Sequence, residues 1–124
     1  MKVITSKDAP AAIGPYSQAV DTGSLVFCAG QIPLDPATGD IVGTTAAEQA
    51  EQVIKNIIGV LSGAGLGLSN VAKASIFLAD MADFAAVNEV YAKHFKEPFP
   101  ARSTFQVAAL PKGARVEIEV IAAR

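Results

Sequence analysis

The sequence predicts an α+β fold in which two helices cover one face of a five- or six-stranded sheet. Its hydrophobic pattern gives the order β-β-β-α-β-α-β-β over residues 1–124, which we expect to form one domain. Hydrophobic residues make up 51% of the chain and charged residues only 18%, which is more apolar surface than one modest core hides. We therefore expect a homo-oligomer, in which a second copy of the chain covers the other face of the sheet.

The first three strands are predicted at residues 2–5, 16–20 and 25–29. The third, Leu25-Val-Phe-Cys-Ala29, is a continuous apolar run that is typical of a buried strand. Between the first two strands, the segment Asp8–Pro15 contains two prolines and a glycine, which exclude a helix interior. Residues 31–43 form a predicted loop with a turn at Pro36–Gly39.

The first helix is predicted to begin after Thr45, because Glu48 three residues later completes the signature of a capping box. Its apolar residues recur with helical spacing on one face: Ala50, Val53, Ile54, Ile57, Ile58, Leu61 and Ala64. The glycines of Gly63–Gly67 are predicted to end this helix. Residues 71–79, with β-branched and aromatic residues toward their end, predict the next strand.

The second helix is predicted to be capped by Asp83 and to end before Pro98. Its apolar stripe consists of Phe84, Val87, Tyr91 and Phe95. Asn88 places an amide on this stripe, and a buried amide needs hydrogen-bond partners. Nearby backbone groups are the commoner partners of such a residue, and a ligand is the alternative.

The last two strands are predicted at residues 101–110 and 115–123, joined at Pro111–Gly113. Alternation directs Val116, Ile118 and Val120 toward the helices, with Phe105 on the core side of the preceding strand. The face away from the helices is predicted to carry the polar side chains Arg102, Thr104, Gln106, Arg115, Glu117 and Glu119. On an ordinary strand face these groups would be solvated, whereas under a second copy of the chain their charges must be paired or used.

Arg102 is the strongest candidate for a binding residue. It is one of only three arginines and follows the proline-stiffened segment Glu97–Ala101. A guanidinium held in one place suits bidentate binding of a small carboxylate. A structural ion pair is the alternative role.

The composition disfavours several classes of function. A net charge of −2 argues against a nucleic-acid-binding protein, and no stretch approaches the ~20 apolar residues of a membrane span. A single cysteine forms no internal disulfide, so we expect a cytoplasmic protein. We expect neither a metal nor a cofactor: His94 has no ligand partners at metal-site spacing, Cys28 lies within an apolar strand, and Gly63–Gly67 follows a helix instead of linking a strand to a helix.

Five segments resemble the RidA (YjgF) reactive-intermediate deaminases, and they occur in order over nearly the whole chain. The segments are Ala11–Ala19 (AAIGPYSQA), Ala29–Pro33 (AGQIP), Asp83–Asn88 (DFAAVN), Pro100–Ser103 (PARS) and Val107–Glu119 (VAALPKGARVEIE). The resemblance implies a chorismate-mutase-like (YjgF) α+β fold that assembles as a homotrimer, with sites in the clefts between subunits.

The resemblance also implies an activity, the hydrolysis of 2-imino acids such as 2-iminobutanoate and 2-iminopropanoate to 2-keto acids and ammonia. Carried over by motif, Arg102 binds the substrate carboxylate, and Glu117 positions or activates the attacking water. The other site residues that the resemblance implies are Tyr16, Gly30, Asn88 and Thr104. Thr104 stands where many relatives have cysteine, and Ala29 where some have serine, so no thiol chemistry is carried over.

A simple hairpin of the last two strands would contradict this shared site. Paired around Pro111–Gly113, the strands would separate Arg102 from Glu117 by ~20 Å, at ~3.3 Å per residue. We therefore expect either that the two strands do not form a simple hairpin or that the two residues meet across a subunit boundary. A nearby Arg102 would favour the ionised form of Glu117.

The alternative function is a non-catalytic trimer that binds a metabolite or a protein in the same pocket. Glu117 favours the enzyme, because binding a carboxylate needs only Arg102. Ribonuclease activity, sometimes attributed to this family, is disfavoured by the acidic balance of the chain. A chorismate mutase is disfavoured as well, because it would have to bind a dicarboxylate with only three arginines in the chain.

Overall fold

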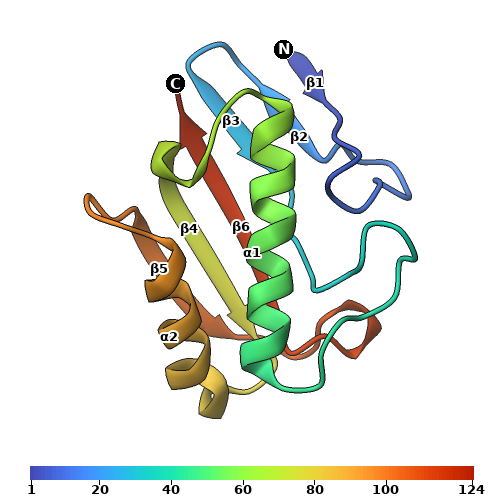
Figure 1. The fold of residues 1–124 in the computed structure, drawn as a ribbon, viewed down its shortest axis with the longest axis vertical. Helices are drawn as coiled ribbons and strands as arrows, with labels where there is room; N and C mark the ends of the chain where they lie inside the picture. Colours follow the sequence, from blue (N-terminus) through green and yellow to red (C-terminus); the bar gives the residue numbers. More distant parts are fainter.

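A six-stranded sheet organises the molecule in a computed structural model that describes residues 1–124 (Figure 1). The strands are β1 (Lys2–Ile4), β2 (Ala19–Asp21), β3 (Leu25–Cys28), β4 (Val71–Leu78), β5 (Ala101–Gln106) and β6 (Val116–Ala123). The helices are α1 (Ala46–Gly63) and α2 (Phe84–His94), with short 3-10 helices at Leu68–Asn70, Met81–Asp83 and Pro111–Gly113. The predicted order of strands and α-helices is confirmed, although the second and fifth strands are shorter than the predicted 16–20 and 101–110.

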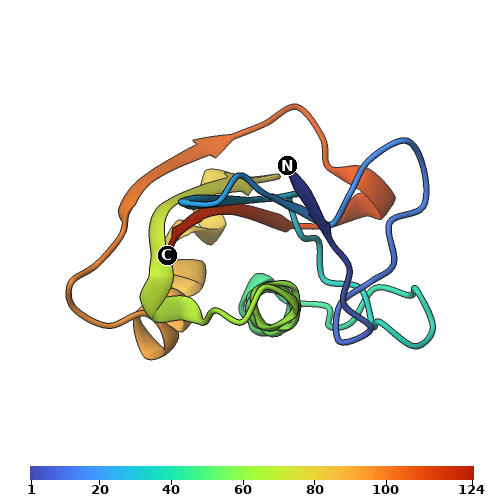
Figure 2. The ribbon, with the colours of Figure 1, turned by 90° about the horizontal axis from the view of Figure 1, so that it is seen from above.

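Both helices lie on the same face of the sheet, as predicted. Seen from above in Figure 2, α1 and α2 form one layer beneath the strands, and no helix covers the opposite, open face. Val53, Ile54 and Ile57 of α1 are buried between the layers. Ile58 is 40% exposed, so the prediction that it shares the buried face is wrong: one further residue turns the side chain about 100° away from the sheet. Neither helix is of a length and hydrophobicity that would let it cross a membrane.

The start of α1 is the capping box that the sequence predicts. The Thr45 hydroxyl accepts a hydrogen bond from the backbone N–H of Glu48 at 3.2 Å, and the Glu48 carboxylate accepts one from the N–H of Thr45 at 3.1 Å. The hydrogen bonds from Thr45 and Thr44 lower the pKa of Glu48. Two of the free N–H groups at this helix end are thereby satisfied.

The start of α2 differs from the prediction. Asp83 has helical backbone angles (φ −85°, ψ −2°), and its side chain does not cap the helix, because a capping side chain needs an extended backbone. The Asp83 carboxylate instead accepts hydrogen bonds from the Arg115 guanidinium at 3.1 Å. Arg115 was predicted on the face of the sheet away from the helices, but its side chain contacts the turn before α2 instead. Asp80 caps the preceding 3-10 helix by accepting from the N–H of Ala82 at 2.9 Å.

The last two strands are not neighbours. The strand order is β1-β2-β3-β6-β4-β5, so β4 lies between β6 and β5, antiparallel to the first and parallel to the second. The expectation that these strands form no simple hairpin is therefore confirmed. The connection at Pro111–Gly113 leads from the edge of the sheet back to its centre (Figure 1).

This pairing places Arg102 on the helix-bearing face, contrary to the prediction. Arg102 lies opposite Ala74 of β4, and Thr104 lies opposite Ile76; both β4 residues are buried in the core. Gln106, opposite the buried Leu78, shares their face. Alternation along β5 was predicted correctly, but the face that each half of the pattern occupies is set by the register with β4.

Glu117 lies on the open face, as predicted. It is opposite Phe77 of β4, which in turn is opposite Phe105 of β5. Phe105 was predicted on the core side, yet it is 55% exposed on the open face. Arg102 and Glu117 therefore project from opposite sides of the same sheet.

Candidate active site

The guanidinium of Arg102 is held against α2 by an amide and two aromatic rings. Its Nη1 donates a hydrogen bond to Oδ1 of Asn88 at 2.7 Å. Its central carbon lies 4.8 Å from the ring centroid of Tyr91 and 5.8 Å from that of Phe84. We call Phe84, Asn88, Tyr91 and Arg102 the Arg102 cluster. Asn88 thus contacts a candidate binding residue and not the backbone groups that are its commoner partners.

Arg102 is the only arginine without an acidic partner. Arg115 pairs with Asp83 at 3.1 Å, and Arg124 pairs with Asp21 at 2.6 Å. No carboxylate oxygen lies within 4.0 Å of the Arg102 guanidinium. Arg102 therefore forms no structural ion pair within the chain, which was the alternative role for it. Most of its five N–H donors remain available.

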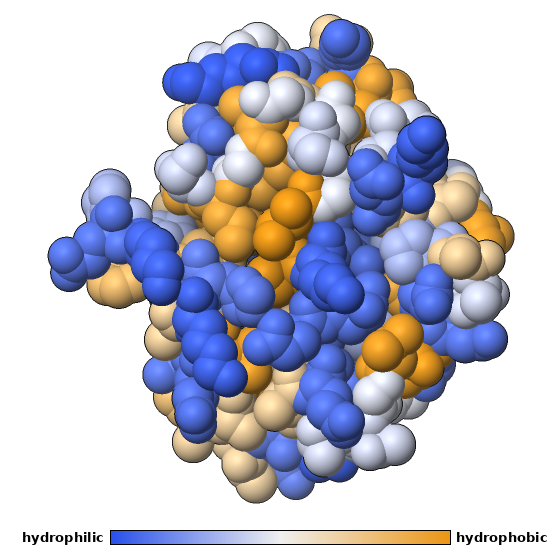
Figure 3. Space-filling model, in the orientation of Figure 1, coloured by the Kyte–Doolittle hydropathy of each residue, from blue (hydrophilic) through white to orange (hydrophobic).

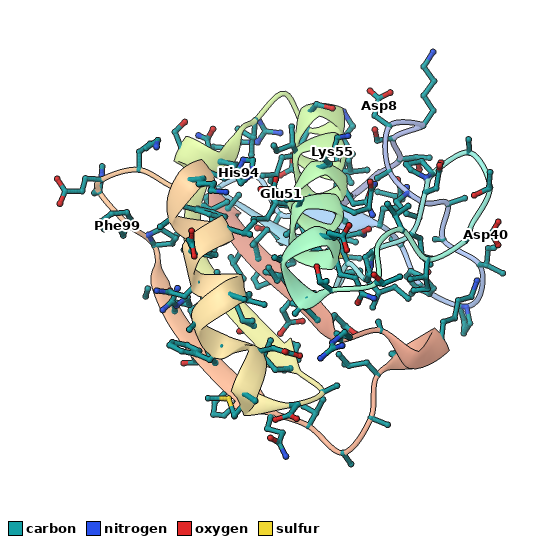
Figure 4. All side chains as sticks on the ribbon, turned by 60° about the horizontal axis from the view of Figure 1, so that its bottom comes forward. Asp8, Asp40, Glu51, Lys55, His94 and Phe99 are labelled. Atoms are coloured by element: carbon teal, nitrogen blue, oxygen red, sulfur yellow. The ribbon has the colours of Figure 1, made fainter.

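A cleft of about 450 Å³ adjoins the Arg102 cluster. Its lining residues are Asn88, Tyr91, Ala92, Phe99, Pro100 and Arg102. Figure 4 shows Phe99 on the segment that leads from α2 to β5, where it is 60% exposed. Thr104, two residues along β5 from Arg102, is half-buried on the same face of the sheet.

A second cleft, of about 570 Å³, contains Glu117. Tyr16, Gly30, Ile32 and Lys112 line the same cleft, and Tyr16 is 54% exposed. The Glu117 carboxyl group lies directly against Gly30: a Cβ atom at this glycine would be 2.9 Å from the carboxyl carbon and would overlap one of its oxygens. Only glycine leaves room for the carboxylate in this position.

The electrostatic surroundings of Glu117 differ from the expectation. Burial and, secondarily, the neighbouring charge of Glu119 raise the pKa of Glu117. The expected effect was the opposite, because Arg102 was predicted to lie beside this carboxylate and favour its ionised form. Within one chain Arg102 is on the far face, so it provides no such stabilisation.

The six predicted site residues thus form two groups. Arg102, Asn88 and Thr104 belong to the helix-bearing face at the β5 edge, whereas Tyr16, Gly30 and Glu117 line the other cleft. Two strand spacings, about 10 Å, separate β5 from β6, and Arg102 lies three residues, about another 10 Å, from the position level with Glu117. A four-carbon imino acid is too short to contact both groups within one chain.

Sequence reasoning missed the role of Tyr91, which was assigned only to an apolar helix stripe. The available signal was its spacing: Tyr91 comes three residues after the predicted binding residue Asn88, so the two side chains lie one turn apart on the same face of the helix.

Cys28 is buried, and burial raises the pKa of its thiol to about 11, so it is protonated at neutral pH. His94 contacts Glu51 at 2.7 Å between the two helices (Figure 4).

The open face of the sheet exposes large apolar side chains. Val3, Phe27 and Phe105, from β1, β3 and β5, are 57%, 41% and 55% exposed. The helix-bearing face, seen in Figure 3, carries polar residues around a hydrophobic area near its centre. Exposed aromatic residues on a bare sheet face are typical of a surface that another chain covers.

Comparisons with known proteins give a consistent family assignment. Residues 6–124 match the family described as Endoribonuclease L-PSP. A 2-iminobutanoate/2-iminopropanoate deaminase from Bos taurus is 52% identical over 121 residues, covering 98% of this chain and 88% of the relative. The crystal structure of RidA from the Antarctic bacterium Psychrobacter has a TM-score of 0.96 at 45% identity, over 100% of both chains. The crystal structure of E. coli TdcF with bound serine has a TM-score of 0.94 at 45% identity, covering 100% of this chain and 99% of that one.

Proposed function

Because the chain belongs to the Endoribonuclease L-PSP family, that of the reactive-intermediate deaminases RidA and YjgF, we propose that it hydrolyses 2-imino acids to 2-keto acids and ammonia. The proposed substrates are small, such as 2-iminobutanoate and 2-iminopropanoate, the compounds in the names of several relatives about 50% identical to this chain. No cofactor is part of the proposal.

One observation carries the proposal for this chain's own residues: Arg102 is the only arginine without an acidic partner, yet its guanidinium is fixed by Asn88 and Tyr91. A half-buried cation in a fixed orientation, beside a cleft, is suited to bind a carboxylate that comes from outside the chain. Every 2-imino acid carries such a carboxylate next to its reactive C=N carbon.

The two groups of site residues are proposed to meet between copies of the chain in a homotrimer. The open face that carries Glu117 also exposes Phe27 and Phe105, which another copy would cover. The Arg102 cluster lies at an edge strand, where a neighbouring chain can approach it. Across such a boundary, the positive charge of Arg102 would lower the raised pKa of Glu117 toward its ordinary range.

In the proposed mechanism, Arg102 binds the carboxylate and holds the C=N carbon in place. Glu117 accepts a proton from water as the water oxygen attacks the carbon of the protonated imine and forms a tetrahedral carbinolamine. Glu117 returns this proton to the amine nitrogen. It then accepts the proton of the new hydroxyl group as the C=O bond forms, the C–N bond breaks and ammonia leaves, and the 2-keto acid remains. Tyr16, Asn88, Thr104 and the backbone of Gly30 complete the walls around the substrate.

Competition for the imine tests this function. An amino-acid oxidase generates 2-imino acids while semicarbazide traps them, and the protein is expected to slow semicarbazone formation. Arg102→Ala removes one charge-assisted contact of ~1.5–3 kcal/mol, so kcat/KM should fall roughly ten- to a hundred-fold. Glu117→Gln should abolish hydrolysis while ligand binding persists.

Arg115→Ala is the matched control, because this arginine is 45% exposed and pairs with Asp83 outside both clefts. Its activity should equal that of the wild type. If the folded protein slows trapping of none of several imino acids, the chain is a binding protein and not a deaminase.

A further inference from the structure

We propose that Tyr91 is a positioning residue for the substrate carboxylate, because its ring is the platform on which the Arg102 guanidinium lies. This inference rests on the proposed function insofar as Arg102 is taken to bind the carboxylate. Tyr91 itself acts through Arg102 and is not proposed to contact the substrate.

The Tyr91 ring is clamped between two groups. On one side it stacks on Phe95, with 4.1 Å between ring centroids and 12° between the planes. The Arg102 guanidinium lies 4.8 Å from the Tyr91 centroid, and the stacked Phe95 ring leaves room for it only on the opposite side. Tyr91 and Phe95 are 5% and 2% exposed, so neither ring can move without disturbing the core.

Tyr91 and Asn88 constrain different rotations of the guanidinium. The ring sets the position of the guanidinium over α2, through cation–π attraction and packing. The amide oxygen of Asn88 accepts a hydrogen bond from Nη1 at 2.7 Å, and this bond fixes how the guanidinium is turned within its plane above the ring. Arg102 also lines the cleft, so the N–H groups that Asn88 does not engage are available to a carboxylate bound there. An arginine oriented in advance loses less side-chain entropy when a carboxylate binds.

The aromatic ring of Tyr91, and not its hydroxyl group, positions the Arg102 guanidinium. Its hydroxyl oxygen is buried and has no hydrogen-bond partner, so it makes no hydrogen bond to Arg102. Burial also raises the pKa of Tyr91, which keeps the hydroxyl protonated. A phenylalanine in this position should therefore support Arg102 as well as tyrosine does.

Two substitutions separate the effect of the aromatic ring from the effect of the space that it fills. In Tyr91→Phe the platform is kept, whereas in Tyr91→Leu it is replaced by an apolar side chain without a π face. Binding of 2-oxobutanoate should weaken about ten-fold in Tyr91→Leu and stay within about two-fold of wild type in Tyr91→Phe. With imino acid substrates, KM should rise in Tyr91→Leu by a similar factor while kcat changes less than about two-fold.

Val90→Ala is the control for damage to the core. It shortens a side chain of α2 that is 3% exposed and that belongs neither to the Arg102 cluster nor to the stack of Tyr91 on Phe95. This variant should lose thermal stability and retain 2-oxobutanoate affinity. The neutral amide 2-oxobutanamide should bind equally weakly to wild type and to all three variants, since it carries no carboxylate.

A readout without any ligand completes the test. A guanidinium over an aromatic ring has an upfield-shifted side-chain N–H resonance, which should be present for Arg102 in wild type and Tyr91→Phe and absent in Tyr91→Leu. If wild type binds 2-oxobutanoate and Tyr91→Leu binds it equally well, the inference about Tyr91 is wrong and the proposed function stands. If wild type neither binds the keto acid nor consumes imines, the proposed function is wrong, and the role of Tyr91 in carboxylate binding is lost with it.

Discussion

Arg102 and Glu117 lie on opposite faces of one sheet, although only the strand β4 separates β5 from β6. Arg102 is aligned with the buried Ala74, and Glu117 with Phe77 on the open face. A single chain therefore contains both chemical groups of the proposed reaction without being able to use them on one small molecule.

This separation predicts that two impaired variants restore each other's activity. Arg102→Ala and Glu117→Gln chains, unfolded together and refolded as a mixture, should form boundaries at which an intact Arg102 meets an intact Glu117. In a random equal mixture such a pair occurs at about a quarter of the boundaries, so about a quarter of wild-type activity should return in the imine-trapping assay. The same two variants refolded separately and mixed without exchange should show only the residual activity of Arg102→Ala. Absence of recovery from mixed oligomers would show that the two residues do not share a site.

Gly30→Ala should reduce catalysis by displacing Glu117. The added Cβ would overlap the Glu117 carboxylate, which must then leave its position against the backbone. We expect kcat to fall by at least about ten-fold, while 2-oxobutanoate affinity, set at Arg102, changes little. Gly67→Ala is the matched control, because nothing lies within 4 Å of a Cβ there and its φ of −137° suits alanine. Equal activity of Gly30→Ala and Gly67→Ala would show that catalysis does not depend on the position of the Glu117 carboxylate against Gly30.

Glu119→Gln should extend activity to lower pH. Burial and the negative charge of Glu119 both raise the pKa of Glu117, and removing that charge makes ionisation of Glu117 easier. Because a proton acceptor must be ionised, kcat/KM falls as the pH drops through the pKa of Glu117, and this acidic limb should move to lower pH in the variant. The measurement is the pH profile of kcat/KM in both proteins. If the acidic limb stays in place or moves to higher pH, it reports the ionisation of a group other than Glu117.

Tyr91→Phe should stabilise the protein. The Tyr91 hydroxyl is buried without a hydrogen-bond partner, and such a group costs free energy on folding. We expect the free energy of unfolding to rise by about 1 kcal/mol, measured by urea denaturation at one fixed protein concentration. Tyr16→Phe, at a residue 54% exposed, should change it by far less. A large loss of stability in Tyr91→Phe would mean that the hydroxyl has a partner in the assembled protein.

Local features of the chain were predictable because their causes are local. The capping box of Thr45 and Glu48 depends on residues three apart, and it is present as predicted. The end of α2 before Pro98 follows from the backbone of proline, and the buried face of α1 follows from helical periodicity, except at Ile58 on its margin. At Asp83 the local signal misled, because the 3-10 turn before α2 gives the residue helical angles and Arg115 engages its carboxylate.

The sequence alone determined the elements, their order, the family and the identity of Arg102 and Glu117 as the residues to examine. The tertiary structure alone decided which face each of them occupies. Alternation along a strand has a period of two, so the pattern of β5 is compatible with either orientation, and only the parallel pairing of β5 with β4 selects one of them. That partner is 28 residues away in the chain, and no pattern within β5 itself encodes it. The same pairing that turns Arg102 toward Tyr91 and Asn88 turns it away from Glu117, which is why the proposed site requires a second copy of the chain.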